Sequence, residues 1–507
     1  MVVMIRTVPL LLVLIASSVW AGETPSVAPE SGLPPAVTTD LTWAERVDEF
    51  WGQGASTGEK LAFFDTFWHT IDQSFACFQD LDVDWDALRD QYRPEVVAGV
   101  SKGRFAAIMS RLSLALREAH TVALDRDVFW RTPNEPGVPL LVVGQWGQIN
   151  DFGACLTPLP NGGALVYRVV DDHPMGLVPG ETIVGCDGRW WPEVYPELLD
   201  AGLPVTGFWA SSDEGFQHAW HMAVGANWHL FDNLDVQWPG SDLIETRSTA
   251  PLDGWYADLW CTEQLPVPGV SFPDIAHSEL VSWGIIEGTR IGYIYGWGWA
   301  WDAEQEFHDA VAALMDRDDT DGLIIDFRFN MGGNMHLSNP GIELLFNEAV
   351  PTIDWVTRCD PDDHLGLCDE GIFTGYVIRG DPESFYDRPI AVLVGPGAVS
   401  SGDQVALRLA FHPKTRFFGK STNTAFNAAA LAHDDAEFRA TFAYADAFLL
   451  ANPGEYLTHD PLPVDHPVWL TPSDVAAGID TVVEAAIAWI NDVDRTPRRP
   501  SGRATPP

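Results

Sequence analysis

Apolar residues recur at helical spacing in the first part of the chain that follows residue 40. A spacing of three or four positions places them on one face of each of two segments, which is typical of amphipathic helices. The first face holds Leu61, Phe64, Trp68, Ile71 and Phe75, and the second holds Phe105, Ile108, Met109, Leu112 and Leu116. The pattern therefore predicts an N-terminal helical region over residues 41–124.

The pattern changes twice in the remainder of the chain. Residues 125–272 show short strand-like runs between Gly and Pro turns, with one helix expected near residues 216–224. Residues 273–493 alternate apolar strands with amphipathic helices, and this alternation predicts a layered α/β core. Within the core we expect strands at residues 290–296, 323–327 and 390–394, and we expect Asp302 to cap the helix that follows the first of them.

The two ends of the chain are expected to lie outside the fold. Residues 1–21 contain one early Arg, an apolar run too short for a comfortable membrane span, and small residues before Gly22. This arrangement is typical of a secretory signal peptide, with a membrane anchor as the alternative. Residues 22–40 are a linker rich in Pro, Ser and Thr, and residues 494–507 are a basic, Pro-rich tail. The sequence thus predicts a secreted or periplasmic protein whose mature form has no membrane contact.

The charge balance excludes two classes of partner. The 507 residues include 72 acidic and 29 basic side chains, which give a formal net charge of -43, and 46% of them are hydrophobic. Such an acidic surface repels nucleic acid and anionic membranes. The hydrophobic content suffices for several packed domains. Because the aromatic content is normal, the acidity indicates a solvated surface and not disorder.

Six cysteines lie in the expected mature part, an even number that favours disulfides in an exported protein. Cys359 and Cys368 flank a short loop rich in Asp and Gly and are the expected pair, although spacing alone cannot establish a pairing. Their spacing and surroundings do not suit a zinc site, and His218 and His221 lack the acidic neighbour of a metalloprotease helix. We expect no metal and no cofactor.

A candidate nucleophile follows the strand expected at residues 390–394. That strand ends in a small-residue turn, after which an apolar-periodic segment with Asp403 begins a helix. Ser400 lies on this turn, at a helix N-terminus where free backbone N–H groups and the helix dipole favour a developing negative charge. An ordinary N-cap would contain the same residues, so both interpretations stay open on this segment alone.

A paired-glycine turn follows the strand expected at residues 323–327. Gly332 and Gly333 can bring backbone N–H groups close to a ligand because no side chain obstructs them. One N–H group from this turn and that of Ser401 would together form an oxyanion hole. An ordinary tight turn is the alternative.

These segments, in this order, resemble the core of the tail-specific (C-terminal processing) and tricorn-core serine peptidases. The family's Asp-x-Arg-x-Asn-x-Gly-Gly pattern is met from Asp326 to Gly333, and its serine shortly before an acidic residue is met by Ser400 and Asp403. Upstream, residues 112–124 (LSLALREAHTVAL) resemble the family's His-Thr motif, and residues 169–188 resemble the PDZ-like module of these proteases.

The resemblance covers residues 60–490 and implies a fold. It is an α/β fold with a ClpP/crotonase-like layered β-α core, here residues 273–493, an N-terminal helical region and a PDZ-like β module, here residues 125–272. Peptides or proteins would be the substrates, and no cofactor would be needed.

The resemblance also implies catalytic roles. Ser400 would be the nucleophile that forms an acyl-enzyme with a peptide carbonyl. The processing-protease branch activates its serine with a downstream lysine, but Ala425 occupies that position and Lys420 falls at another one. The tricorn-like branch instead uses a histidine from the helical region, a place that His120 occupies. Imidazole suits the role of general base because its ordinary pKa lies near the operating pH.

The third catalytic member, which would orient the imidazole, is not settled by the resemblance. Thr458 stands where the family has a Glu, and Glu455 and Asp460 are close enough in sequence to substitute for it. The oxyanion donors would be those of the paired-glycine turn and of the residue after the nucleophile.

Two other functions remain compatible with the sequence. An inactive relative of the same fold could bind peptides or apolar ligands, and the alternating aromatic residues at positions 293–301 would suit such a surface, although core packing is the favoured interpretation. An esterase of the α/β-hydrolase type is the other, since residues 398–402 (AVSSG) are close to a nucleophile elbow. Its base would be His433, His459 or His466.

Overall fold

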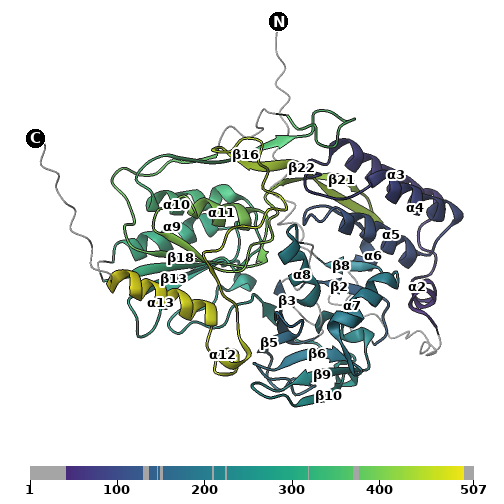
Figure 1. The fold of residues 1–507 in the computed structure, drawn as a ribbon, viewed down its shortest axis with the longest axis horizontal. Coiled ribbons are helices and arrows are strands. Elements are labelled where there is room, and N and C mark those ends of the chain that lie inside the picture. Colours follow the sequence, from purple (N-terminus) through teal and green to yellow (C-terminus); the bar gives the residue numbers. More distant parts are fainter. Residues whose placement is uncertain are drawn as a thin grey trace, which may run out of the picture.

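The computed structural model describes residues 41–129, 136–144, 147–148, 152–207, 210–222, 225–317, 319–368 and 376–495. The expected signal peptide and linker, and the tail after residue 495, lie outside these ranges. Within them, no helix is both long and apolar enough to cross a membrane. Figure 1 shows the described chain passing from N-terminal helices through a teal β region into a green and yellow core.

The N-terminal region is helical, as its periodicity predicts. Its described part holds α2 (Trp43–Trp51), α3 (Thr57–Ser74), α4 (Trp85–Ala98) and α5 (Lys102–Ala115) before the first strand. Ser56 caps α3 through reciprocal hydrogen bonds with Glu59, which satisfy N–H groups that the first turn leaves free. Phe64 and Ile71 are completely buried, so the apolar face of α3 packs inward.

The region between the helices and the core consists mainly of short strands. Its largest sheet has the order β10–β9–β6–β5–β4, with β7 paired to β6. These strands are β4 (Ala154–Pro158), β5 (Ala164–Val169), β6 (Thr182–Cys186), β7 (Arg189–Trp190), β9 (Asn233–Gln237) and β10 (Ile244–Ser248). Two smaller pairs are β2 (Leu141–Val143) with β8 (Val205–Gly207) and β3 (Gly147–Gln148) with β11 (Trp260–Cys261).

This region contains one helix that the sequence predicts and one that it does not. The helix expected near residues 216–224 is α8 (Asp213–Met222), and residues 223 and 224 lie outside the described ranges. The other helix, α7 (Trp191–Asp200), contains Pro192 and Pro196, which argue against a helix when the sequence is read alone. Pro192 is tolerated because the first turn needs no N–H donor.

The core is built on a six-stranded sheet of order β12–β13–β14–β18–β20–β23. The strands are β12 (Val281–Ile285), β13 (Ile291–Gly296), β14 (Gly322–Asp326), β18 (Ile390–Val394), β20 (Thr415–Gly419) and β23 (His466–Pro467). Neighbours from β13 to β23 pair in parallel, and β12 is an antiparallel edge. The three strands predicted here agree with β13, β14 and β18 to within one residue.

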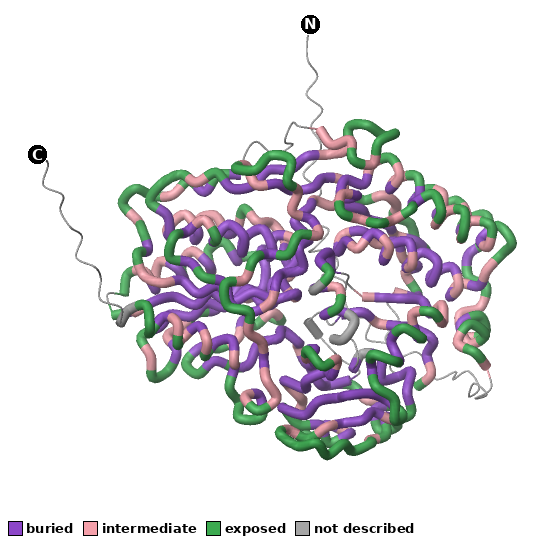
Figure 2. The backbone as a smooth tube through the Cα atoms, in the orientation of Figure 1, coloured by how far each residue is buried: buried purple, intermediate pink, exposed green. Residues whose placement is uncertain are grey.

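Helices cover both faces of this sheet, which makes the core a layered α/β structure. In Figure 1, α9 (Ala303–Met315), α10 (Asn339–Leu345) and α11 (Ser401–Leu409) lie above the strands and α13 (Thr481–Arg495) lies below them. The sheet between these layers is buried along most of its length (Figure 2). Asp302 precedes α9 as predicted, but its side chain makes no capping hydrogen bond.

A second sheet joins the N-terminal region to the core. Its path is β1–β22–β16–β17, with β21 paired to β22. The strands are β1 (Val122–Asp125), β16 (Val350–Thr357), β17 (Tyr376–Ile378), β21 (Ala428–Asp434) and β22 (Phe438–Leu449). Because β1 follows the helical region directly, its pairing with β22 places residues near position 120 beside the C-terminal part of the chain.

The alternating aromatic residues mostly serve packing. Tyr293, Tyr295, Trp297 and Trp299 are buried in the core, whereas Trp301 is 47% exposed. The Tyr293 hydroxyl donates to Asp326 Oδ2 over 2.5 Å. The structure thus supports the packing interpretation for four of the five residues.

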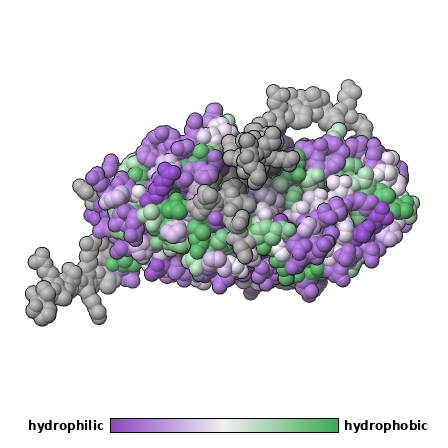
Figure 3. All heavy atoms as spheres, turned by 90° about the horizontal axis from the view of Figure 1, so that it is seen from above, coloured by the Kyte–Doolittle hydropathy of each residue, from purple (hydrophilic) through white to green (hydrophobic). Residues whose placement is uncertain are grey.

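The outer surface agrees with the acidic composition. On the face drawn in Figure 3, hydrophilic residues predominate and hydrophobic ones form small separate patches. The hydrophobic residues are instead concentrated in buried clusters, the largest of which surrounds the core sheet.

The expected cysteine pairing is wrong. Cys155 and Cys261 form a disulfide, whereas Cys359 and Cys368 are not bonded to each other. The latter two lie on a hairpin where Arg358 is opposite Leu367, so Cys359 and Cys368 are diagonal neighbours and not partners across the strands. Diagonal positions in a hairpin lie about 7–8 Å apart, beyond the usual Cα separation of a disulfide.

Removing the disulfide should destabilise the protein strongly. The bridge closes a loop across a sequence separation of 106 residues, so its loss should lower the free energy of unfolding by about 4 kcal/mol. Denaturant unfolding of a Cys155→Ala/Cys261→Ala variant measures this change. A Cys359→Ala/Cys368→Ala variant is the matched control, and a comparable loss of stability in that control would refute the assignment.

Candidate active site

Ser400 lies where the chain turns from β18 into α11. Its backbone has φ 60° and ψ -122°, a conformation that residues with a side chain rarely adopt. It occupies the N-cap position of α11, but its side chain makes no capping hydrogen bond. Ser400 therefore lacks the contact that defines an N-cap, and its hydroxyl lies on a strained turn.

The paired-glycine turn is held against Ser400. β15 (Phe329–Asn330) and β19 (Gly397–Ala398) pair in parallel, so the segments that lead to the two turns run side by side. A side chain on Gly332 would lie 2.8 Å from Ser400 Cβ and 2.7 Å from the Val399 carbonyl oxygen. Gly332 also has a φ of 76°, which favours glycine. The absence of a side chain therefore permits the two turns to touch.

The three expected oxyanion donors are not equivalent. The Gly332 N–H donates to Asn330 Oδ1 over 3.0 Å and is already used. The N–H groups of Gly333 and Ser401 meet no acceptor within the described ranges. The Ser401 hydroxyl donates to the Gly333 carbonyl oxygen over 2.6 Å and ties these residues together. Gly333 and Ser401 are thus the two donors still free to bind an oxyanion.

His120 is brought to the C-terminal part of the chain by strand pairing. It lies between α5 and β1, and Val122 of β1 is opposite Thr441 of β22. The Thr441 hydroxyl donates to the His120 carbonyl oxygen over 2.6 Å. The histidine of the helical region is thereby anchored to the second sheet.

The segments that carry His120 and Ser400 meet in a small buried cluster. Ala119 packs with Val399 and Ala425, and the first two of these residues directly precede the histidine and the serine. Asp403, in the first turn of α11, lies within electrostatic reach of the imidazole. The structure therefore brings together the two segments on which the predicted catalytic pair lies.

Two residues that the sequence reasoning did not select contact the imidazole. His120 Nδ1 lies 2.7 Å from Asn427 Oδ1 and 3.3 Å from Glu118 Oε1. The Asn427 Nδ2 donates to Glu118 Oε1 over 2.7 Å, which turns the amide oxygen toward the imidazole. The ring nitrogen that faces an amide oxygen must carry the proton. The neutral imidazole therefore has its lone pair on Nε2.

The Glu118 carboxylate is completely buried and fully hydrogen-bonded. Besides the Asn427 amide, it accepts the His120 backbone N–H over 2.9 Å and the Thr121 hydroxyl over 2.7 Å. Burial alone would raise the pKa of Glu118, but hydrogen bonds and charge from His120, together with the Thr121 hydroxyl, outweigh it and lower that pKa. The site thus keeps an anion in contact with the imidazole.

The same carboxylate acts on the base. Burial lowers the pKa of the His120 imidazole, but Glu118, with smaller contributions from Asn427 and Asp403, outweighs burial and raises that pKa above 6.5. A raised pKa means that the imidazolium is stabilised, as a general base requires once it has taken a proton.

The sequence suggested three residues for the third catalytic role. Two of them lie away from the His120 imidazole, and one is connected to it through Asn427. Glu455 and Asp460 are both exposed, and the Glu455 carboxylate accepts a hydrogen bond from Asn452. Thr458 is buried, and its hydroxyl lies 3.4 Å from Asn427 Nδ2 and donates to Asp446 Oδ1 over 2.5 Å. Of the three, only Thr458 belongs to the hydrogen-bond network around His120, through Asn427.

A short loop before β21 is fixed to α11 by Asp403. Its buried carboxylate accepts the N–H groups of Thr424 and Ala425 over 2.8 and 3.1 Å. Burial raises the pKa of Asp403 to about 7. Because Asn427 follows on the same loop, this anchor also positions the amide that holds His120.

The other candidates are engaged in different contacts. Lys420 Nζ lies 3.1 Å from His218 Nδ1, and His218 Nε2 lies 2.7 Å from Glu263. His459 Nδ1 contacts a backbone carbonyl oxygen over 3.1 Å. Within the described ranges, no group of His, Cys, Asp and Glu side chains could hold a metal ion.

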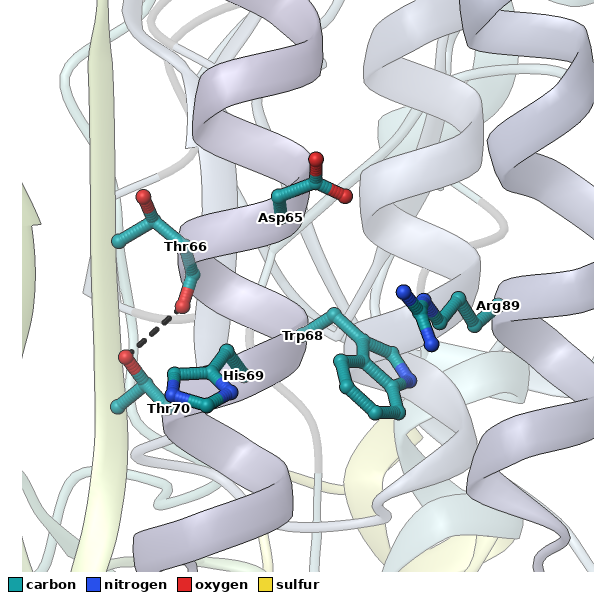
Figure 4. Close-up of a pocket in the computed structure, with 6 residues that line it drawn as sticks. All are labelled: Asp65, Thr66, Trp68, His69, Thr70 and Arg89. Atoms are coloured by element: carbon teal, nitrogen blue, oxygen red, sulfur yellow. Dashed lines mark hydrogen bonds between the residues drawn. The ribbon is translucent and has the colours of Figure 1, made fainter.

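A hollow on the N-terminal helices is lined by none of the candidate catalytic residues. It has a volume of about 480 Å³ and is lined by Asp65, Thr66, Trp68, His69, Thr70 and Arg89. Figure 4 shows five of these residues on α3, with Arg89 approaching Trp68 from α4. The hollow is therefore separate from the candidate active site.

Glu118 could have been found from the sequence, and Asn427 could not. Glu118 stands two positions before His120 in the segment that drew attention to the histidine. Asn427 is 307 positions away in the chain, and nothing in its local sequence marks it as a partner of a histidine.

Comparison with known proteins agrees with this architecture. Residues 290–430 match peptidase family S41, and residues 58–113 match the tricorn protease C1 domain. These ranges cover part of the expected α/β core and part of the helical region. No curated protein sequence matches the chain.

Solved structures share the fold at low sequence identity. Mature CPAF complexed with lactacystin has a TM-score of 0.60 and 11% identity, covering 86% of this chain and 97% of that one. Mature CPAF alone has a TM-score of 0.59 and 11% identity, covering 87% and 99%. A photosystem II D1 C-terminal processing protease matches more loosely, with a TM-score of 0.40 and 15% identity over 82% and 93%.

Proposed function

Because this chain carries a core of peptidase family S41 and a tricorn protease C1 region, we propose that it is a secreted serine endopeptidase. The observation that carries the proposal is the meeting of the Ser400 turn with the segment of His120, whose imidazole is held by a buried carboxylate. A nucleophile, a base and an orienting anion are the components of a serine-protease triad.

In the proposed reaction, Ser400 Oγ attacks the peptide carbonyl carbon and passes its proton to His120 Nε2. The carbonyl oxygen becomes an oxyanion, which the Gly333 and Ser401 N–H groups bind. The imidazolium then gives its proton to the amine as the C–N bond breaks, which leaves an acyl-enzyme on Ser400. Water attacks this ester with the help of His120, and the acid product leaves while Ser400 regains its proton.

Glu118 takes the place of Glu455 and Asp460 in this proposal. Its Oε1 lies 3.3 Å from His120 Nδ1, and the Asn427 amide contacts both groups and bridges them. The negative charge stabilises the imidazolium, and the amide fixes the tautomer. The residues act as a unit, so Asn427 is a positioning residue and Glu118 the anion of the triad.

A comparison of two histidine variants tests this proposal against the esterase alternative. His120→Ala should reduce cleavage of fluorescently labelled casein by about 10³-fold or more, because the base is lost. His459→Ala should leave cleavage within a few-fold of the wild type if it still folds, which thermal unfolding checks. Loss of activity only in His459→Ala would favour the esterase, and a wild type without any cleavage would favour an inactive relative.

A further inference from the structure

Arg408, near the end of α11, is a buried cation without a close counter-ion. Its side chain is completely buried, and its Nη1 donates to Asn339 Oδ1 over 2.9 Å and to Ser338 Oγ over 3.3 Å, both of them neutral acceptors. Among the described residues, no acceptor lies in hydrogen-bond geometry with its Nε or Nη2. Within the described ranges no carboxylate forms an ion pair with it, and Glu343 acts on it only from a distance.

Arg328, the other buried arginine of the described core, provides a comparison because its charge is compensated by carboxylates. Arg328 is equally buried, but it forms ion pairs with Asp326 and Asp480 at 2.6 and 2.8 Å. A buried charge that lacks such partners is strongly unfavourable. Burial accordingly lowers the pKa of Arg408 to about 10. Two unused donors and an uncompensated charge are what an anionic ligand would satisfy.

Arg408 lies on the helix face that also carries the oxyanion donor Ser401. Positions 401 and 408 are two turns apart and share one face of α11, and both contact the segment that begins at the paired-glycine turn. Ser401 contacts Gly333, and Arg408 contacts Asn339. Residue 408 is about 12 Å along the axis from residue 400, and helical side chains tilt toward the N-terminus. Such a tilt would bring the guanidinium nearer than its Cα atom to the end of α11 that carries Ser400.

Polar groups connect the guanidinium with the surface. The Tyr376 ring lies 4.3 Å from the Arg408 guanidinium carbon. The Tyr376 hydroxyl donates to Asn339 Oδ1 over 2.6 Å and lies 3.2 Å from Nδ1 of His336, which is exposed. Polar contacts thus lead from the buried guanidinium to an exposed histidine.

We propose that Arg408 determines specificity by binding a carboxylate group of the peptide substrate, in a subsite that Asn339 and Tyr376 complete. The carboxylate is either an acidic side chain near the scissile bond or the free C-terminus of the peptide. This inference rests on the proposed peptidase function, since it assigns a substrate class to the same site.

Binding to the Ser400→Ala protein tests the subsite without requiring turnover. The probes are fluorescent peptides that are identical except for Glu or Gln at each position in turn, each made with a free or an amidated C-terminus. We expect one of these changes to weaken binding at least about tenfold, as for loss of a charged hydrogen bond. A preference for Glu identifies a side chain as the ligand, and a preference for the free end identifies the C-terminus.

The preference must depend on Arg408. Adding Arg408→Met should abolish it, Arg408→Lys should retain part of it, and the exposed Arg416→Gln should leave it intact. Equal binding of all the probes to the Ser400→Ala protein would overturn the proposal, and so would a preference that survives in a folded Arg408→Met protein. If the methionine variant does not fold, the lysine variant replaces it, and a preference of unchanged size in a folded Arg408→Lys protein would overturn the proposal. Cleavage of casein by the wild type without any such preference would overturn only the subsite and leave the peptidase proposal standing.

Discussion

A Ser400→Ala variant should hydrolyse peptide substrates with a kcat about 10⁴- to 10⁶-fold below that of the wild type, as expected when the nucleophile of an acyl-transfer triad is removed. The loss should appear in kcat more than in KM, because the hydroxyl contributes to the reaction and little to substrate binding. Steady-state hydrolysis of a labelled peptide measures both constants. Thermal unfolding should change little, since the side chain makes no capping bond.

The neighbouring serine provides the matched control for that experiment. Ser401→Ala removes a hydroxyl that donates to Gly333, but it keeps the backbone N–H proposed as an oxyanion donor. Its kcat should stay within about tenfold of the wild type, as for the loss of one neutral hydrogen bond. The reverse pattern, with full loss in Ser401→Ala and activity in Ser400→Ala, would show that Ser400 is not the nucleophile.

A Glu118→Gln variant should lower kcat/KM by about 10² to 10⁴-fold, as when the carboxylate of a serine-protease triad is neutralised. The carboxylate raises the pKa of His120, and the base must be neutral to act. Activity should therefore rise with pH through a pKa above 6.5 in the wild type. Without the carboxylate, the imidazole loses its proton more easily, so this rise should move to lower pH in the variant.

The pH profile of kcat/KM separates this role from a purely structural one. A mutation that only loosened the fold would reduce activity without moving the acidic limb. Glu455→Gln is the control for the residue suggested by sequence, and it should leave both the rate and the profile unchanged. An unshifted limb in a folded Glu118→Gln protein, or a shifted limb in Glu455→Gln, would contradict the assignment.

Local patterns were sufficient to predict the core strands and the turn that carries Ser400. β18 is a continuous apolar run between Pro389 and Gly395, and β14 is a shorter apolar run between Gly322 and Asp326. Such runs are expected where helices cover both faces of a sheet. The serine turn and the glycine turn each follow such a strand. Local signals were therefore enough to propose that an N–H group of the glycine turn and that of Ser401 form an oxyanion hole. The parallel pairing of β14 with β18, which brings both turns to one edge of the sheet, is seen only in the structure.

Contacts between distant segments could not be predicted in the same way. The Asn427 contact with His120 depends on the pairing of β1 with β22 and on the anchoring of a loop by Asp403. The cysteine pairing is a second example. The hairpin register that keeps Cys359 from pairing with Cys368 is a property of the folded chain, and so is the contact between Cys155 and Cys261. For the cysteines, the pair nearest in sequence was chosen and a remote pair is bonded. For His120, the remote Glu455 and Asp460 were chosen, and the carboxylate in contact is the nearby Glu118.

The two glycines show the same limit at smaller scale. The sequence indicates that Gly332 or Gly333 supplies an oxyanion donor, but it does not indicate which. Only the folded turn shows that the Asn330 side chain occupies the Gly332 N–H. Hydrogen-bond competition of this kind is decided by side-chain geometry.

The central claim is that His120 activates Ser400 across the boundary between the helical region and the core. The rate at which a fluorophosphonate probe modifies the purified protein, with the modified residue identified by peptide mass spectrometry, tests this claim directly. We predict a single adduct on Ser400 that forms at least about 10³-fold more slowly in His120→Ala. An adduct on another residue, or labelling of Ser400 at an unchanged rate without the imidazole, would contradict it.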